Sequence, residues 1–219
     1  METLDTLLRD AEAAHGHLCA GQVLGVRMAI LGCRMLGIDD PRGLVTRADR
    51  KRLVTFVEID RCATDAIAVV TGCRLGKRAL KFRDWGKMAA SFLDLGRPAD
   101  PALGIEAIAG GRAVRIAALE SSKLRAQEMY PHIEGKNAQQ MLAYREMPDQ
   151  DLFSAQWVSI PLHGREMPGY KSARIACDVC GEGINYDREI VREEDGGAMR
   201  TLCQSCAFPE ASYYQVLSD

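Results

Sequence analysis

Two Cys-x-x-Cys pairs near the C-terminus limit what this chain can fold into more than any other feature. Cys177 and Cys180 form the first pair, Cys203 and Cys206 form the second, and 22 residues separate the pairs. Two such pairs at about this spacing are typical of a structural Zn²⁺ ion held by four cysteines. The segment is too short to fold on its own apolar content, so we expect the metal to supply most of its stability. A redox-active Cys-x-x-Cys pair is the alternative.

The sequence around these cysteines predicts a small separate domain, 171–219. Gly181 and Gly183 permit a tight knuckle after the first pair, and residues 189–192 and 199–202 are predicted to form a hairpin. The second pair is expected to open a short helix. From residue 171 onward the chain has 5 Lys and Arg against 9 Asp and Glu, a net charge of −4. Such a segment repels phosphate, so nucleic acid is an unlikely partner and a role in oligomerisation or protein contact is favoured.

A second group of metal-binding residue types lies near the N-terminus, where His15, His17 and Cys19 fall within five residues. Imidazole and thiolate ligands together suit zinc best. If the backbone is extended, the alternation points all three side chains to one side. The structural alternative is that a histidine at a helix start only caps it and that a lone cysteine is a small buried hydrophobe. We predict a metal-binding or catalytic role for the triplet.

Residues 1–165 are predicted to form an α+β domain with a mixed β-sheet. Apolar residues recur at helical spacing over 3–14 and 19–36, and Gly21, Gly25 and Gly32 give the second helix a small-residue face. The β-branched run 52–60 predicts a strand, and 62–72 a short buried helix. Segment 37–43 is rich in turn residues. The remaining expectations are strands near 79–83, 87–92, 112–119 and 153–160, helices over 121–130 and 137–146, and a linker over 161–170.

The first core strand leads directly to further candidates for the N-terminal site. Cys62 follows this strand, and α/β sheets usually place their sites at the carboxyl ends of strands. If Cys62 joins the triplet, three side chains can bind a second Zn²⁺ or another transition metal while one position stays open for water or substrate. Asp60 and Cys73 are further candidates. Asp65 lies on the same helix face as Cys62 and is expected to orient a ligand imidazole, unless it only assists the helix N-terminus.

The composition of the chain limits its size class, its partners and its location. With 219 residues and 47% apolar content, the chain can bury one sizeable core and carry a second module. A net charge of −2 argues against a protein whose overall charge attracts nucleic acid or membranes. No stretch approaches eighteen apolar residues and the N-terminus lacks signal-peptide character, so a cytoplasmic protein without membrane contact is expected. Because disulfides form mainly in secreted proteins and no secretion signal is found, metal binding explains the eight cysteines better than disulfides do.

The core domain contains a basic run, whose charge is opposite to that of the acidic C-terminal segment. Only Asp84 offsets its six cations, which are Arg74, Lys77, Arg78, Lys81, Arg83 and Lys87. The run either seats an anionic small molecule or forms a solvated face.

Several stretches occur in an order that resembles the formylmethanofuran dehydrogenase E-subunit family. They are HGHLCAG, CATDAIAVVTGCRLGKRALKFRDWGKMA, GRAVRIAALESSKLRA, MPDQDLF and the four-cysteine module. The resemblance spans nearly the whole chain. It implies a thioredoxin-like core with a mixed sheet flanked by helices, a treble-clef zinc finger and a homodimer. It also implies a core metal site at His15, His17, Cys19 and Cys62, with Cys73 and Lys77 nearby.

The resemblance and the residues together suggest three functions. The family takes its name from molybdenum or tungsten formylmethanofuran dehydrogenases, which favours an accessory or maturation protein for a molybdenum or tungsten pterin oxidoreductase. The core site would then handle metal, sulfur or an anionic pterin intermediate. A free-standing zinc enzyme is the second possibility, with metal-bound water as nucleophile or base and Asp60 or Lys77 as acid or base. A zinc-finger regulatory protein is the third. The candidate catalytic residues are Cys19, Cys62, Cys73, Lys77 and Asp60.

Overall fold

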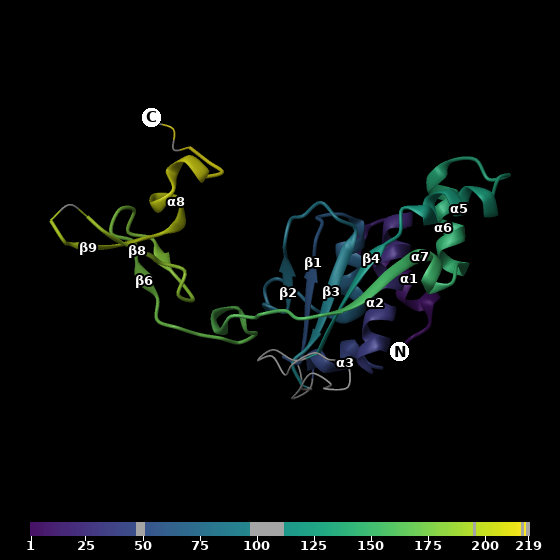
Figure 1. Cartoon of the computed structure of the whole chain (residues 1–219), viewed down its shortest axis with the longest axis horizontal. Coiled ribbons are helices and arrows are strands. Elements are labelled where there is room, and N and C mark those ends of the chain that lie inside the picture. The colour runs from purple at the N-terminus through teal and green to yellow at the C-terminus, as the bar shows by residue number, and fades with distance from the viewer. Residues whose placement is uncertain (47–50, 97–111, 195, 216, 218–219) are drawn as a thin grey trace. The chain divides into compact units, whose positions relative to one another are not determined.

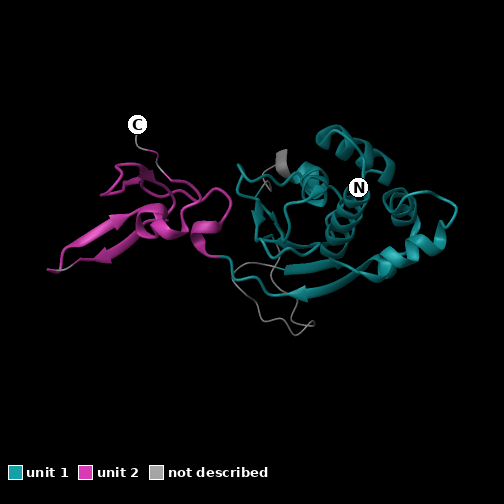
Figure 2. Ribbon diagram, turned by 90° about the horizontal axis from the view of Figure 1, so that it is seen from above, with its two compact units in different colours: residues 1–162 teal, residues 163–219 magenta. Residues whose placement is uncertain are grey.

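A computed structural model describes residues 1–46, 51–96, 112–194, 196–215 and 217. The chain divides into two compact units, Met1–Leu162 and His163–Asp219 (Figure 2). Unit 1 contains helices and a five-stranded sheet, and unit 2 contains short strands and a short helix near the C-terminus (Figure 1). Among the described helices, none has the length and apolar character needed to cross a membrane.

Unit 1 opens with two consecutive helices, as predicted. Helix α1 (Leu4–His15) starts at Thr3, whose Oγ1 accepts a hydrogen bond from the Thr6 amide at 3.3 Å. Gly16 ends α1 in the left-handed region, with φ at +97°. Helix α2 (Ala20–Leu36) begins a few residues later and is buried along most of its length. This short connection fixes the end of α1 beside the start of α2.

The sheet is mixed, which confirms the predicted α+β class. Strand β1 (Leu53–Val57) leads into helix α4 (Cys62–Thr71), and β2 (Leu80–Phe82) returns parallel to β1. The other strands pair antiparallel in the order β2-β1-β3-β4-β5. They are β3 (Ala89–Asp94), β4 (Arg112–Ala118) and β5 (Phe153–Val158).

Helices α2 and α4 pack against the sheet and approach each other closely. A Cβ atom placed on Gly25 would lie 2.5 Å from the Ala63 carbonyl oxygen and 2.7 Å from its Cα. One placed on Gly32 would lie 2.3 Å from the Phe92 ring in β3. The small-residue face predicted for α2 is therefore the surface that contacts α4 and the sheet.

Two short helices of unit 1 were not predicted, and two longer ones were. Helix α3 (Pro41–Thr46) occupies part of the segment expected to be turns, because Asp40 Oδ1 accepts the Gly43 amide at 2.9 Å and Pro41 stands at the first helical position. Helix α7 (Asp149–Leu152) is a single turn. Helices α5 (Ser121–Met129) and α6 (Lys136–Glu146) form where the sequence indicated.

Unit 2 contains the predicted hairpin and short helix. Strands β8 (Ile190–Glu193) and β9 (Met199–Leu202) form the hairpin, and helix α8 (Gln204–Ala207) follows. An additional two-stranded ladder pairs β6 (Ile175–Ala176) with β7 (Gly183–Ile184). A knuckle, a hairpin and a helix in this order make the treble-clef arrangement. The buried hydrophobic cluster of the unit is very small and consists of Cys177, Ile184, Leu202 and Ala207.

Candidate metal centres

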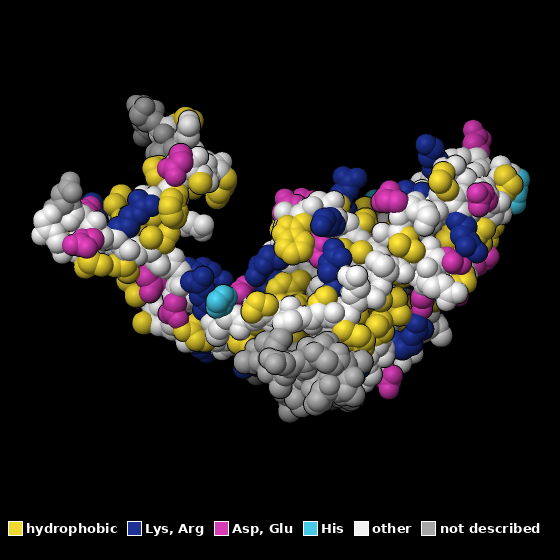
Figure 3. Space-filling view, viewed as in Figure 1, with side chains coloured by type: hydrophobic (Ala, Val, Ile, Leu, Met, Phe, Trp, Pro, Cys, Tyr) yellow, Lys and Arg dark blue, Asp and Glu magenta, His cyan; other side chains and the backbone are white. Residues whose placement is uncertain are grey.

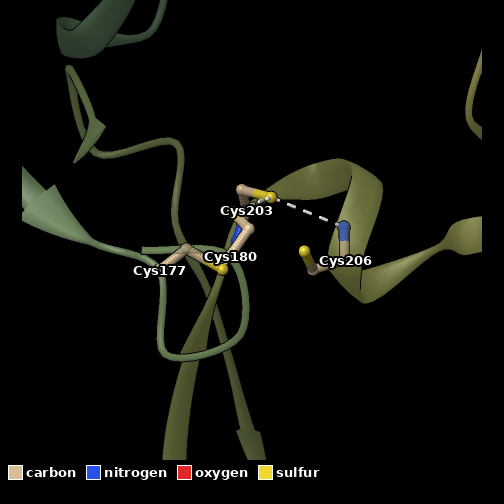
Figure 4. A group of neighbouring side chains, drawn as sticks. All are labelled: Cys177, Cys180, Cys203 and Cys206. Carbon is tan, nitrogen blue, oxygen red and sulfur yellow. Dashed lines mark hydrogen bonds between the residues drawn. The ribbon is translucent and has the colours of Figure 1, made fainter. Parts of the chain in front are cut away.

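The four cysteines of unit 2 come together around one point (Figure 4). Cys177 and Cys180 lie on the knuckle after β6, while Cys203 caps α8 and Cys206 lies within it. Their sulfur atoms are all within 4.8 Å of one another, and Cys180 Sγ is 3.8 Å from Cys203 Sγ. In a tetrahedral site with metal–sulfur bonds of about 2.3 Å, neighbouring sulfurs are about 3.8 Å apart. The group therefore has the dimensions needed to hold a metal ion.

Backbone amides stabilise negative charge on these sulfurs. The Cys203 amide donates to Cys177 Sγ at 3.3 Å, and the Cys206 amide donates to Cys203 Sγ at 3.4 Å. Hydrogen bonds from the backbone, from Cys180 first and then from Cys203, lower the pKa of Cys177 to about 6. The hydrogen bond with Cys203 raises the pKa of Cys206 to about 12. A metal ion would replace the shared protons of this cluster.

A second pair of thiols meets in unit 1. Cys19 is the residue that precedes α2, and Cys62 is the first residue of α4. The two thiols are neighbours, because burial first and then the adjacent Cys19 thiol raise the pKa of Cys62. A Cβ atom on Gly21 would lie 3.3 Å from Cys62 Cβ and 3.7 Å from Cys19 Sγ. The absence of a side chain at Gly21 therefore leaves room for both thiols at the paired helix starts.

His15 stands beside this thiol pair and is oriented by a carboxylate. It is the last residue of α1, and its Nδ1 lies 2.8 Å from Asp65 Oδ2 in α4. The contact expected between Asp65 and an imidazole is present. Because a carboxylate only accepts, Nδ1 carries the proton, and Nε2 keeps the lone pair that a metal or a reacting group would use.

His17 and Asp60 complete the surroundings of the pair. The backbone is not extended from His15 to His17, because His15 ends α1 and Gly16 adopts a left-handed conformation. The His17 ring nevertheless stays beside the His15 ring, with centroids 4.9 Å apart. Asp60 lines a pocket of about 430 Å³ together with His15 and Cys62. Arg61, Thr64 and Asp65 form the rest of its wall.

Cys73 and Lys77 lie away from this pocket, beyond the other end of α4. Cys73 follows the far end of α4, a ten-residue helix about 15 Å long. It is 2% exposed and accepts a hydrogen bond from Thr55 Oγ1 at 3.4 Å, and its burial raises the pKa of the thiol. Cys73 is thus part of the core. Lys77 lies in the loop beyond it and lines a different pocket.

The core residues, as they are placed, do not form a closed coordination sphere. Within the described residues, the only group with three or more ligand atoms inside 4.8 Å is the four-cysteine group of unit 2. The structure thus brings the Cys19 and Cys62 thiols together at the starts of α2 and α4, and it places His15, with the His17 ring next to it, at the same pocket as Cys62.

One residue at this location was missed by sequence reasoning. Asn137, at the start of α6, accepts the Ala20 amide through its Oδ1 at 3.1 Å. It therefore caps α2 next to Cys19 from 117 positions away in the chain. An asparagine at a helix start predicts a cap for its own helix, so no local signal pointed to this contact.

The basic run is divided by the fold and does not form one surface. Lys and Arg side chains are visible over β1 and β2 (Figure 3). Within the run, Arg83 stacks over the Phe56 ring, Lys87 stacks over the Trp85 ring, and Lys81 is only 9% exposed. Arg74 and Lys77 instead line the pocket beyond the far end of α4.

Comparison with known proteins identifies the family. Residues 14–154 match the family described as FmdE, molybdenum formylmethanofuran dehydrogenase operon. The chain belongs to the FmdE family. The FmdE match begins one residue before His15 and includes Cys19, Cys62 and Asp65.

Two individual proteins are also similar to this chain. The crystal structure of an FmdE-like protein from Syntrophus aciditrophicus, named after tungsten formylmethanofuran dehydrogenase, shares the fold with a TM-score of 0.58. It is 18% identical, and the alignment covers 96% of this chain and 95% of that one. A curated protein from Archaeoglobus fulgidus, a probable S-adenosyl-L-methionine-binding protein, is 36% identical over 90 residues, which are 41% of this chain. This chain spans about a quarter of that relative, with 24% covered.

Asp65 provides a direct test of the site geometry. In Asp65→Asn the amide no longer favours a proton on Nδ1 of His15, so we expect the neutral imidazole to shift toward the Nε2-protonated form. Stability should change by less than about 1 kcal/mol, because the carboxylate is 59% exposed. Nitrogen-15 NMR of the histidine rings measures the tautomer. Asp84→Asn, which removes an exposed carboxylate elsewhere, is the control, and an unchanged His15 spectrum in Asp65→Asn would refute the contact.

Proposed function

We propose that this protein is a metal-binding accessory protein of a molybdenum or tungsten pterin oxidoreductase, acting in the maturation of that enzyme. The Cys19–Cys62 pair carries the proposal. These cysteines are 43 positions apart in the chain, and they meet beside a pocket that His15 and Asp60 line together with Cys62. Thiolates bind soft transition metals and sulfur species, which are the cargo that assembly of such an enzyme requires. The family description supports the link to molybdenum.

His15, His17, Cys19 and Cys62 are the residues proposed to hold a second Zn²⁺ or another transition metal. Two thiolates and one or two imidazoles form a donor set suited to such an ion. When bound, the ion would act as a Lewis acid or as a transferable cargo. Asp65 keeps Nε2 of His15 available, and the pocket opens His15 and Cys62 to solvent.

Cys177, Cys180, Cys203 and Cys206 are proposed to hold a structural Zn²⁺. Four cysteines with backbone amides on their sulfurs match the closed coordination of a structural site. The module is also proposed to serve protein contact, in a homodimer or with the partner enzyme. Its net charge of −4 from residue 171 onward favours protein over nucleic acid as the partner.

A free-standing zinc enzyme is the second candidate function. The observation that favours it is Asp60, an exposed carboxylate in the same pocket as Cys62 and His15. A carboxylate there can accept a proton from a bound water or substrate. This alternative predicts turnover by the isolated protein without any partner.

Metal content per chain tests the two-site proposal. Protein purified without oxygen should contain two metal equivalents by plasma mass spectrometry. Cys19→Ser/Cys62→Ser should lose one equivalent without unfolding, and Cys177→Ser/Cys180→Ser should lose the other. A single equivalent, lost only with the second variant, would contradict a metal in the core site.

Gene deletion in the host tests the accessory role itself. We expect the molybdenum or tungsten content of the host's pterin oxidoreductases to fall several-fold. Wild type should restore it and Cys19→Ser/Cys62→Ser should not, whereas Cys33→Ala, which changes a buried cysteine of the core cluster, should restore it. Normal metal loading in the deletion strain would rule out the accessory role.

A further inference from the structure

A second pocket lies at the other end of α4 from the thiol pair. It has a volume of about 590 Å³, and its walls come from α1, α3, the end of α4 and the loop that follows. Arg42, Arg74 and Lys77 bring three cations to it, and Asp10 is the only carboxylate in its wall. Neither the metal sites nor the proposed function accounts for this convergence.

The three cations differ in how far they are neutralised. Arg42 donates through Nε to the Val69 carbonyl at 3.0 Å and through Nη1 to Asp10 Oδ2 at 2.6 Å, and it also contacts Glu2. Arg42 thus satisfies the C-terminal end of α4 and cancels the charge of Asp10. Arg74 and Lys77 are exposed, and neither forms an ion pair with a carboxylate of the described residues. The pocket therefore keeps a positive charge.

A tight turn fixes where the two unpaired cations lie. The carbonyl of Arg74 accepts the amides of Lys77 at 3.2 Å and Ala79 at 3.3 Å. This turn begins two residues after Gly72, which ends α4 with φ at +70°. Both cations therefore project from a hydrogen-bonded segment anchored at the end of a buried helix.

The remaining walls are small or apolar. They include Ala13 and Ala14 of α1 together with Val69 and Gly72 of α4. A volume of this size falls within the range of sites for small organic ligands, about 300–1,000 Å³, and is far larger than a bare oxyanion needs. Arg and Lys side chains are the usual partners of phosphate oxygens.

We propose that this pocket binds a small organic molecule carrying a phosphate or pyrophosphate group. The charged group lies against Arg74 and Lys77, and the organic part lies against the alanine and glycine surface. The site is independent of the proposed metal chemistry, because Cys62 stands at the opposite end of the ten-residue α4, about 15 Å away.

Calorimetric titration of the full chain with pyrophosphate at low ionic strength tests the charged half of the site. We expect one saturable site in wild type and at least ten-fold weaker binding in Arg74→Ala/Lys77→Ala. The matched control is Arg83→Ala/Lys87→Ala, which removes two cations of the same run that lie outside the pocket and should leave the affinity within two-fold. Cys19→Ser/Cys62→Ser should also bind normally, so loss of core metal and loss of this site are separable.

A second titration tests the organic half. Adenosine monophosphate should bind more tightly than inorganic phosphate, and the Gly72 amide should shift in two-dimensional NMR spectra of the complex. Equal affinity for adenosine monophosphate and inorganic phosphate would show that the pocket binds only the oxyanion, which would contradict the proposal of an organic ligand. No saturable pyrophosphate binding, or equal weakening in both double variants, would overturn the pocket altogether.

Discussion

Cys177→Ser/Cys180→Ser is expected to unfold unit 2 and to leave unit 1 folded. The buried hydrophobic cluster of unit 2 is too small to stabilise the unit without metal, and one of its four members is itself a ligand candidate, Cys177. Structural zinc binding by small domains contributes about 10–16 kcal/mol, which is folding free energy for the module. Without two of the four thiolates that contribution disappears, and no described apolar contact replaces it.

Hydrogen exchange read by mass spectrometry measures this result for each unit. Peptides covering β8 and β9 should exchange at the rate of an unfolded chain in the variant, while peptides from α2 keep their protection. Val179→Ala is the matched control, because this side chain lies between the same two cysteines and is 56% exposed. Retained protection in the hairpin of the double variant would show that metal does not hold the unit together.

Gly25→Ala is expected to destabilise unit 1 by about 1–3 kcal/mol. In an isolated helix, alanine is more favourable than glycine by up to about 1 kcal/mol. The sign of the change in unfolding free energy therefore depends on the contact with α4. The added Cβ would meet the backbone oxygen and Cα of Ala63 at 2.5 and 2.7 Å, and backbone atoms inside a helix cannot rotate away. Helix α2 must then move from α4, and the core loses packing.

Urea unfolding of Gly25→Ala and wild type measures the difference. Gly76→Ala is the matched control, since a Cβ there meets no atom within 4 Å. The same displacement separates Cys19 from Cys62, so the core metal equivalent should fall together with stability. Equal midpoints for Gly25→Ala and wild type would show that the two helices are not held as closely as described.

Most of the secondary structure follows from local patterns. The β-branched run around β1, the buried apolar run of α4 and the apolar spacing of α2 each identify their element, because burial of one face selects the period of the sequence. Helices α3 and α7 were missed for a local reason as well. Each has six residues or fewer, so one cap and a few turn residues decide its conformation.

The four-cysteine module could be predicted from the sequence, since the spacing within Cys-x-x-Cys and the hairpin between the pairs are local properties of the chain. The sequence also supplied the residues of the core site. The fold sets how those residues pair: Cys19 with Cys62, His15 with Asp65, and Asn137 on the start of α2. It likewise moved Cys73 into the core and Lys77 to a separate pocket. These contacts join residues 43 to 117 positions apart on different helices, so they depend on how α1, α2, α4 and α6 pack together, which no local pattern specifies.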